Sequence, residues 1–337
     1  MVPVAIFVEL VFKSTTVMKQ ILNFLACLIS ITAMTAIAAD APKTGVYLTP
    51  ESAGPDFKVQ GEYAGEKLGA QVIALGDGKF RVVFFRGGLP GAGWDKSPKL
   101  EVEAVTTAGK TAFGKAGGWS GEISGEALTG KSDKDELVQL KKTFRKSPTI
   151  GAKPPTGAVV LFDGTSADNF SPGKLTAEGF LAEGANSKRK FQSQKLHIEF
   201  LLPFQPTARG QGRGNSGCYL QGRYEVQVLD SFGLKGENNE CGGIYTIASP
   251  EVNMCLPPLS WQTYDIEFTT AKFDGAGNKT EAARITILHN GVKIHDDVKL
   301  PKSTTASPLK EGPEPGFLHL QNHGNPVRYR NIWVVEK

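Results

Sequence analysis

The stretch that most clearly indicates the fold class is Ile285-Thr-Ile-Leu-His-Asn-Gly-Val-Lys-Ile-His295. Apolar and polar residues alternate on both sides of Asn290-Gly291, as they do in strands with one buried face. An Asn-Gly pair supplies the positive φ values that a two-residue type I′ turn needs. The stretch therefore predicts a β-hairpin.

The same alternation runs through the C-terminal half of the chain. In Leu196-His-Ile-Glu-Phe200 the three apolar side chains share one face and the two polar ones share the other. Comparable runs follow at 223–228, 261–268, 317–323 and 327–335. Alternating strands with few helices predict an all-β fold built as an antiparallel sandwich of two sheets. One face of each sheet fills the core, which leaves the other free to form a binding surface.

The rest of the chain divides into further segments. Residues 40–133 contain short predicted strands and turn clusters, which indicate a small β-rich domain without a catalytic constellation. Residues 134–155 combine a mild helical period with a Pro- and Gly-containing end, and are predicted to form a surface helix and a linker. The sandwich is expected to occupy 156–337.

The N-terminus resembles a secretory signal. Met18-Lys19-Gln20 precedes an apolar run, Ile21 to Ile37, with small residues at its end. We expect residues 1–39 to be a signal peptide whose true start is Met18. The protein is then secreted or periplasmic, and no stable membrane span remains after the signal is cleaved.

Charge and cysteine content exclude some classes of function. The 38 Lys and Arg residues and 34 Asp and Glu residues are mixed along the 337-residue chain. No basic stripe occurs, so a nucleic-acid partner is not expected. Behind the signal the cysteines are Cys218, Cys241 and Cys255. Because export permits disulfides, Cys241 and Cys255 are predicted to pair across a loop, with Cys218 buried and free.

A polar strand is the first candidate site. Alternation in Gly217–Asp230 is expected to place five side chains on one face of a strand: Tyr219, Gln221, Arg223, Glu225 and Gln227. Aromatic, amide, guanidinium and carboxylate groups suit a sugar, whose ring stacks and whose hydroxyls form hydrogen bonds. Glu225-x-Gln-x-x-Asp230 also resembles the Glu-x-Asp-x-x-Glu strand of laminarinase-type glucanases, where a bulge returns the last carboxylate to the same face.

Three other segments carry candidate residues. The glycine-rich stretch 209–217 is expected to line a pocket with Arg213 and Asn215. Alternation in 317–323 places His319, Gln321 and His323 on one face. His323, at a strand end, is the candidate proton shuttle, whereas His319 is expected to be an ordinary hydrogen-bonded surface residue. Glu240 is equally compatible with a pocket acid and a loop charge. A histidine could also join Glu225 or Glu240 around a divalent metal.

The order and spacing of several motifs resemble one family. They are Asn215-Ser-Gly217, Gln221-Gly-Arg-Tyr-Glu-Val-Gln-Val-Leu-Asp230, Gly242-Gly-Ile-Tyr245, Trp261-Gln-Thr-Tyr-Asp265 and Gln321-x-His-Gly-x-x-Val-x-Tyr-Arg-Asn-Ile332. Together they are similar to the 3-keto-disaccharide hydrolase family over about 158–335. The resemblance implies a concanavalin-like jelly roll preceded by a small β-rich domain. It also implies cleavage of a glycoside that has been oxidised to a ketone at C3.

A C3 ketone acidifies the C2 proton, so a base can form an enolate that expels the C1 oxygen, and water can add to the resulting enone. On this hypothesis Glu225 or His323 is the base, Glu240 or Asp230 is the acid, and Arg213 or a divalent metal stabilises the enolate. Side chains expected to hold the sugar are Asn215, Tyr219, Gln221, Gln227, Trp261 and Gln321. The alternatives are a non-catalytic carbohydrate-binding module, a conventional glycoside hydrolase and a cell-surface adhesion module.

Overall fold

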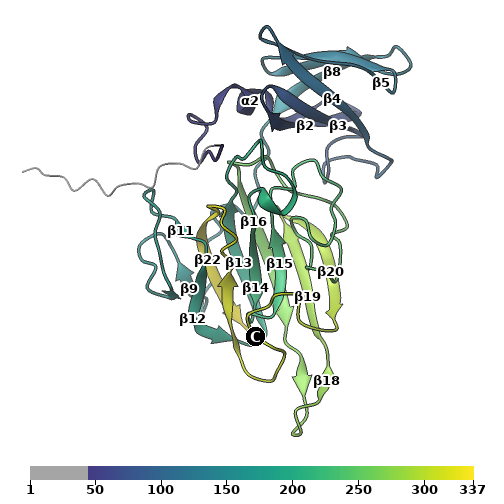
Figure 1. The fold of residues 1–337 in the computed structure, drawn as a ribbon. Coiled ribbons are helices and arrows are strands. Elements are labelled where there is room, and N and C mark those ends of the chain that lie inside the picture. Colours follow the sequence, from purple (N-terminus) through teal and green to yellow (C-terminus); the bar gives the residue numbers. More distant parts are fainter. Residues whose placement is uncertain (1–44) are drawn as a thin grey trace, which may run out of the picture. The chain divides into compact units, whose positions relative to one another are not determined.

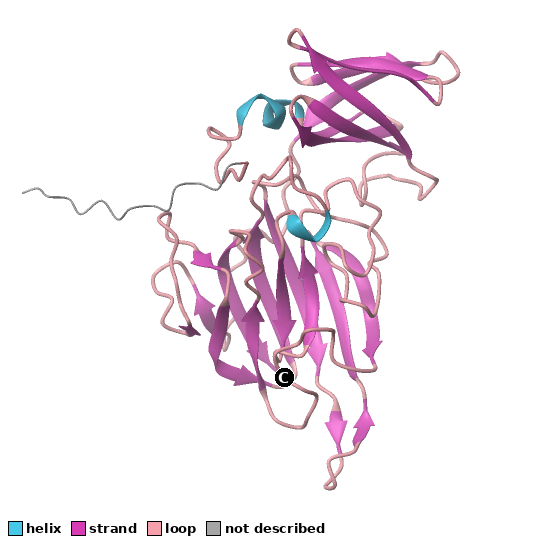
Figure 2. Ribbon diagram, in the orientation of Figure 1, coloured by secondary structure: helices cyan, strands magenta, loops and turns pink. Residues whose placement is uncertain are grey.

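The computed structural model describes residues 45–337. The predicted signal peptide at 1–39, with its start at Met18, lies outside the described residues. Across 45–337, no helix combines the length and the hydrophobicity that crossing a membrane would require. Strands supply nearly all the regular structure (Figure 2), which confirms the predicted all-β class.

The N-terminal part of the described chain is a closed barrel of eight antiparallel strands that neighbour one another in sequence order (Figure 1). A short helix, α2 (Gly54–Val59), precedes it. The strands are β1 (Gly61–Ala64), β2 (Leu68–Gly76), β3 (Lys79–Arg86), β4 (Leu100–Thr107), β5 (Lys110–Ala116), β6 (Trp119–Ser124), β7 (Ala127–Lys131) and β8 (Leu137–Thr143). Buried side chains such as Phe80, Phe84 and Leu128 fill the interior, as expected for a barrel of this size.

The prediction of a helix within 134–155 is wrong. Residues 137–143 form strand β8, which pairs with β7 on one side and with β1 on the other. Val138 and Leu140 point inward and are buried, while their neighbours Leu137 and Gln139 are exposed. This strand closes the barrel and so removes two free sheet edges.

The predicted linker is an ordered strap on the sandwich. The Thr149 hydroxyl donates to Asp265 over 2.7 Å, and the backbone N–H of Gly151 donates to Glu199 over 2.6 Å. The carbonyl of Ala152 accepts from the Asn331 side chain at 3.0 Å. We call residues 147–152 the strap. Its hydrogen bonds cover polar side chains on the outer face of one sheet.

The C-terminal part is the predicted two-sheet sandwich. The five-stranded sheet has the order β10 (Phe170–Ser171), β12 (Ala185–Phe191), β21 (Gly316–Leu320), β14 (Ser216–Leu220) and β15 (Tyr224–Val228). The seven-stranded sheet has the order β11 (Leu181–Ala182), β22 (Arg328–Glu336), β13 (Gln194–Leu201), β16 (Trp261–Thr269), β19 (Ala283–His289) and β20 (Val292–Leu300), and β9 (Val159–Phe162) pairs with β22. Minor elements are η1 (Gly210–Gly212) and the ribbon of β17 (Lys272–Phe273) and β18 (Lys279–Glu281).

The sandwich core lies between the two sheets. Val226 and Leu320 from the five-stranded sheet belong to the same buried cluster as Ile266 and Ile287 from the seven-stranded sheet. The predicted hairpin is confirmed: β19 and β20 pair around Asn290 and Gly291, which have φ values of 51° and 78°. Because the apolar faces meet in the core, each sheet turns its polar side chains outward.

Candidate functional site

The candidate site is on the outer face of the five-stranded sheet, and a tight hairpin forms its centre. Residues 217–228 do not form the single strand that their alternation suggested. Gln221 and Gly222 adopt φ values of 54° and 60°, and Leu220 accepts a hydrogen bond from the N–H of Arg223. The chain therefore reverses between β14 and β15. Tyr219 stands directly opposite Glu225 as a result.

A row of four polar side chains crosses this face. Asn186 of β12 pairs in register with His319 of β21, which pairs with Tyr219 of β14, which pairs with Glu225 of β15. The Tyr219 hydroxyl donates to Oε2 of Glu225 over 2.8 Å, and His319 Nδ1 lies 2.6 Å from Oδ1 of Asn186. The rings of Tyr219 and His319 are 5.1 Å apart between centroids. Four strands thus hold one continuous polar row.

Glu225 has the properties of a proton-transfer group. The residue is only 3% exposed, and this burial raises the pKa of its carboxyl group to about 7, although the bond from Tyr219 opposes the shift. The hydrogen bond from the Tyr219 hydroxyl goes to Oε2 and leaves Oε1 outside that contact. One oxygen is therefore fixed by the fold, and the pKa of the carboxyl group lies near neutrality, where general acid–base catalysis is most effective.

Gly217 makes room for this carboxyl group. A Cβ atom at residue 217 would lie 2.3 Å from Oε1 of Glu225 and 2.8 Å from the ring of Tyr219. Both separations are shorter than non-bonded atoms tolerate. The last residue of the Asn215-Ser-Gly217 motif thus has no side chain where the carboxyl group of Glu225 lies over the sheet.

His319 is the site residue that the sequence interpretation undervalued. It is half-buried in the polar row, and burial lowers the pKa of its imidazole. The amide oxygen of Asn186 can only accept, so Nδ1 carries the proton and Nε2 keeps its lone pair. His323, the preferred candidate, is exposed beyond β21, and its carbonyl accepts from Asn325. The alternation of 317–321 already placed His319 and Gln321 on one face.

Three predicted sugar-binding residues lie around the row. Gln321 donates through Nε2 to the Tyr219 hydroxyl at 3.2 Å. Gln227, two residues from Glu225 on the same face, donates to Oδ1 of Asn215 at 2.9 Å. The structure therefore gathers amide groups beside the carboxylate, where they can bind hydroxyl or carbonyl oxygens.

The two predicted acid partners do not contact Glu225. Asp230 forms a buried ion pair with Arg213, in which Nε lies 2.6 Å from Oδ2. Asp230 was a predicted acid, and Arg213 was predicted to stabilise the enolate. Their ion pair with each other engages both side chains. The carboxylate of Glu240 accepts the backbone N–H groups of Gly236 and Glu237, at 2.6 and 3.1 Å. It therefore fixes the fold of its own loop.

Two predicted sugar-binding residues have structural contacts instead. Gln221 lies in the hairpin turn, where its amide donates to the carbonyl of Phe191 and accepts from the hydroxyl of Thr270. Trp261 belongs to the seven-stranded sheet and packs against Phe180, with the Arg330 guanidinium 4.0 Å above its ring. Neither is part of the row around Glu225.

The predicted disulfide is not formed. Cys241 and Cys255 are buried free thiols, and Cys218 is likewise buried and free. Cys241 also contacts the Tyr264 hydroxyl at 3.2 Å. The thiols are packed as parts of the core.

The described residues do not offer a metal site. Across 45–337 no three His, Cys, Asp or Glu side chains gather closely enough to hold an ion. In particular, His323 and Glu240 do not join Glu225 in a ligand set. We therefore derive no chemical step through a metal.

Comparison with known proteins agrees with the sandwich and its motifs. Residues 157–335 match the family described as the 3-keto-alpha-glucoside-1,2-lyase-like domain, as the sequence resemblance predicted. A candidate glycosyl hydrolase from Parabacteroides distasonis is 31% identical with a TM-score of 0.50, over 55% of this chain and 85% of that chain. Another from the same organism is 17% identical with a TM-score of 0.41, over 54% and 94% of the two chains. No curated protein was found to match. The family and the first structure indicate a carbohydrate-active domain of glycosyl hydrolase type.

Proposed function

Because the chain belongs to the 3-keto-alpha-glucoside-1,2-lyase-like family, we propose that it cleaves glycosides whose C3 hydroxyl has been oxidised to a ketone, with Glu225 as the proton-transfer group. The observation that carries this proposal is the buried, oriented carboxyl group of Glu225. One of its oxygens is held by Tyr219, and burial raises its pKa to about 7. The N-terminal sequence supports an exported, periplasmic or secreted location for this activity.

The proposed reaction is an elimination followed by a hydration. Glu225 takes the proton from C2, and the C–H electron pair forms an enolate with the C3 carbonyl. The enolate electrons then form the C1–C2 double bond as the bond from C1 to the leaving oxygen breaks. That oxygen takes up a proton, which protonated Glu225 can return because its pKa is near neutral. Water then adds across the double bond.

Side chains near Glu225 can be assigned to the other steps of the proposed reaction. Gln321 retains a second N–H on Nε2 after donating to Tyr219, and we assign it to the enolate oxygen. We assign His319 to the hydration step, since its free Nε2 can accept a proton from water. Gln227 and Asn215 are placed to bind sugar hydroxyls. Arg213, Asp230 and Glu240 have no part in it, because each is engaged elsewhere.

The arrangement is less suited to a conventional glycosidase. A retaining mechanism needs two carboxyl groups about 5–5.5 Å apart across the scissile bond. The predicted partner Asp230 is paired with Arg213 and so is not available as the second carboxylate. An elimination route needs one proton-transfer group rather than a matched carboxylate pair.

The test compares a 3-keto-glucoside with the matching unoxidised glucoside. We expect release of the leaving group from the keto compound alone, and a loss of at least about 100-fold in kcat for Glu225→Gln. Glu240→Gln is the matched control and should retain activity. Cleavage of the unoxidised glucoside would establish a conventional hydrolase, and sugar binding without turnover would establish a binding module. Repeating the assay with a chelator shows directly whether a metal takes part.

A further inference from the structure

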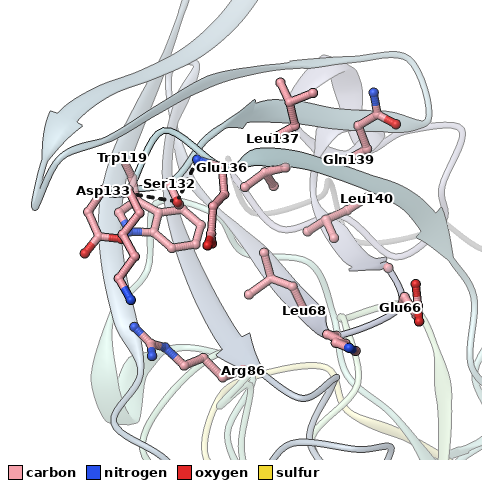
Figure 3. Close-up of a pocket in the computed structure, with 14 residues that line it drawn as sticks. Glu66, Leu68, Arg86, Trp119, Ser132, Asp133, Glu136, Leu137, Gln139 and Leu140 are labelled. Carbon is pink, nitrogen blue, oxygen red and sulfur yellow. Dashed lines mark hydrogen bonds between the residues drawn. The ribbon is translucent and has the colours of Figure 1, made fainter.

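One end of the eight-stranded barrel has a cavity that the sandwich site does not use. Its volume is about 520 Å³, within the range of about 300–1,000 Å³ that is typical of small-molecule sites (Figure 3). Leu68 and Leu140 form an apolar wall (Figure 3). The barrel interior beneath is filled by side chains such as Phe84. A ligand would therefore bind at this end rather than inside the barrel.

The indole of Trp119 forms part of the cavity lining and is held rigidly. Its ring lies 4.7 Å from that of Phe84 between centroids, and only 8% of the residue is exposed. The indole Nε1–H is a hydrogen-bond donor carried by a residue of the cavity lining. An indole N–H usually finds a partner when the ring is buried. A ligand hydroxyl in the cavity can supply this partner.

The rim of the cavity is polar and preformed. The Ser132 hydroxyl accepts the backbone N–H groups of Lys134 and Glu136, at 3.2 and 3.3 Å, and so fixes the loop between β7 and β8 (Figure 3). This loop carries Asp133 and Glu136 to the rim, and Arg86 reaches it from the end of β3. Carboxylate and guanidinium groups are the side chains that bind vicinal hydroxyls in pairs of hydrogen bonds.

The lining is balanced in charge. Three bases and three acids border the cavity: Lys67, Arg86, Lys134, Glu66, Asp133 and Glu136. This balance disfavours nucleic acids and other polyanions, which require a net basic surface. The filled interior likewise leaves no room for a fatty chain. A ligand with one apolar face and a hydroxyl-bearing edge matches both the wall and the rim.

We propose that this end of the barrel is a second carbohydrate-binding site, which takes a hexose unit of a neutral oligosaccharide. The apolar face of the sugar ring lies against Leu68, Leu140 and the edge of Trp119. Its hydroxyls bind Arg86, Asp133, Glu136 and the indole N–H. The barrel then holds the enzyme on glycan while the sandwich acts on its own substrate. This inference does not depend on the 3-keto chemistry proposed for Glu225.

The experiment uses the full chain with Glu225→Gln to stop turnover. Neutral gluco- and galacto-oligosaccharides are first screened on a glycan array, and the strongest ligand is titrated by calorimetry. The test variants are Arg86→Ala, which removes a rim donor, and Trp119→Phe, which keeps an aromatic ring against Phe84 but removes the N–H. The matched control is Lys110→Ala, an exposed cation at the turn between β4 and β5.

We expect affinity to fall at least about tenfold in both test variants and to be unchanged in the control. Thermal unfolding of each variant checks that the barrel remains folded. The proposal is overturned if no neutral oligosaccharide binds, if both variants bind as the control does, or if only anionic glycans bind. Failure of these binding tests would leave the turnover assay of Glu225 unaffected, so the two proposals fail separately.

Discussion

The Tyr219 hydroxyl lies 2.8 Å from Oε2 of Glu225, on the strand directly across from it. The two residues are only six positions apart, and the hairpin turn at Gln221 and Gly222 brings them face to face. Burial of the carboxyl group raises its pKa, and the hydrogen bond that it accepts from the phenol limits the rise. The same contact orients the acid and limits how far burial raises its pKa.

Replacement of this phenol tests the relationship directly. In Tyr219→Phe the ionised carboxylate loses a donor, so the pKa of Glu225 should rise further above its ordinary value. A base must be ionised to accept a proton, and the acidic limb of the kcat/KM profile on a 3-keto-glucoside should therefore move to higher pH. At neutral pH turnover should fall by about tenfold. An unchanged acidic limb would show that Glu225 is not the titrating base.

The raised pKa also predicts a stability cost for the site. A carboxyl group whose pKa is 4.5 when exposed and about 7 in the folded protein binds its proton more tightly in the folded state. Stability should then fall as pH rises between these two values. Glu225→Gln removes the ionised form, so it should stabilise the protein above pH 7 by up to ~3 kcal/mol and have little effect below pH 4.5. Denaturant unfolding at several pH values measures this, with Glu240→Gln as the control.

Local signals in the sequence were sufficient to predict some of the turns and strands of this structure. Asn290-Gly291 predicted its hairpin correctly, because both residues commonly adopt positive φ. Gln221-Gly222 makes a comparable reversal, but glutamine is uncommon at positive φ and the polar–apolar alternation continues through the turn. The pattern therefore resembled a single strand. The mistaken helix at 137–143 has a related cause, since its charges obscured a period of two and only barrel closure requires that strand.

Some features of the candidate site could be predicted from alternation along one strand, and others depend on contacts that exist only in the folded sandwich. The shared face of Glu225 and Gln227 was predictable, because the two residues alternate on one strand. The pairing of Arg213 with Asp230 was not, since the residues are 17 positions apart and meet only in the folded sandwich. Their mutual ion pair removes two candidates for catalysis. Placing His319 beside Tyr219 likewise required the strand order of the sheet, which alternation along one strand does not contain.

Gly217 provides a test of the geometry of the site. In Gly217→Ala the new Cβ would meet Oε1 of Glu225 at 2.3 Å, so the carboxyl group must move. We expect kcat to fall by about 100-fold, because a displacement of about 1 Å can have that effect. Gly275→Ala is the matched control, since no atom lies within 4 Å of a Cβ there. Equal activity in the two variants would contradict the proposed role of Glu225.

The structure predicts that the three buried cysteines remain reduced in the native protein. Cys241 and Cys255 are free, and burial raises the pKa of the Cys218 thiol to about 12, which suppresses its reactive thiolate. Since all three thiols are buried, iodoacetamide should modify none of them in the native protein and all of them after denaturation. Peptide mapping by mass spectrometry under non-reducing conditions checks this. A peptide linked through residues 241 and 255 would show that the disulfide forms instead.

Glu199, on the outer face of the other sheet, anchors the strap. Burial alone would raise the pKa of this carboxyl group. The His197 imidazole 3.6 Å away and hydrogen bonds from Asn331, Gly151 and Arg330 outweigh it and lower the pKa to about 2. The folded state thus favours the ionised form. Its contribution to stability is complete above pH 4.5, the ordinary pKa, and is lost as pH falls toward 2.

Glu199→Gln should therefore reduce the free energy of unfolding at neutral pH by about 3 kcal/mol, because it leaves the buried partners of a charged network unmatched. The difference from the parent protein should shrink as pH falls below 4.5. The exposed Glu267, which pairs with Lys337, is the matched control, and Glu267→Gln should cost less than about 1 kcal/mol. Urea unfolding across this pH range measures both. A difference between Glu199→Gln and the parent that does not change with pH would mean that the charge of Glu199 does not hold the strap.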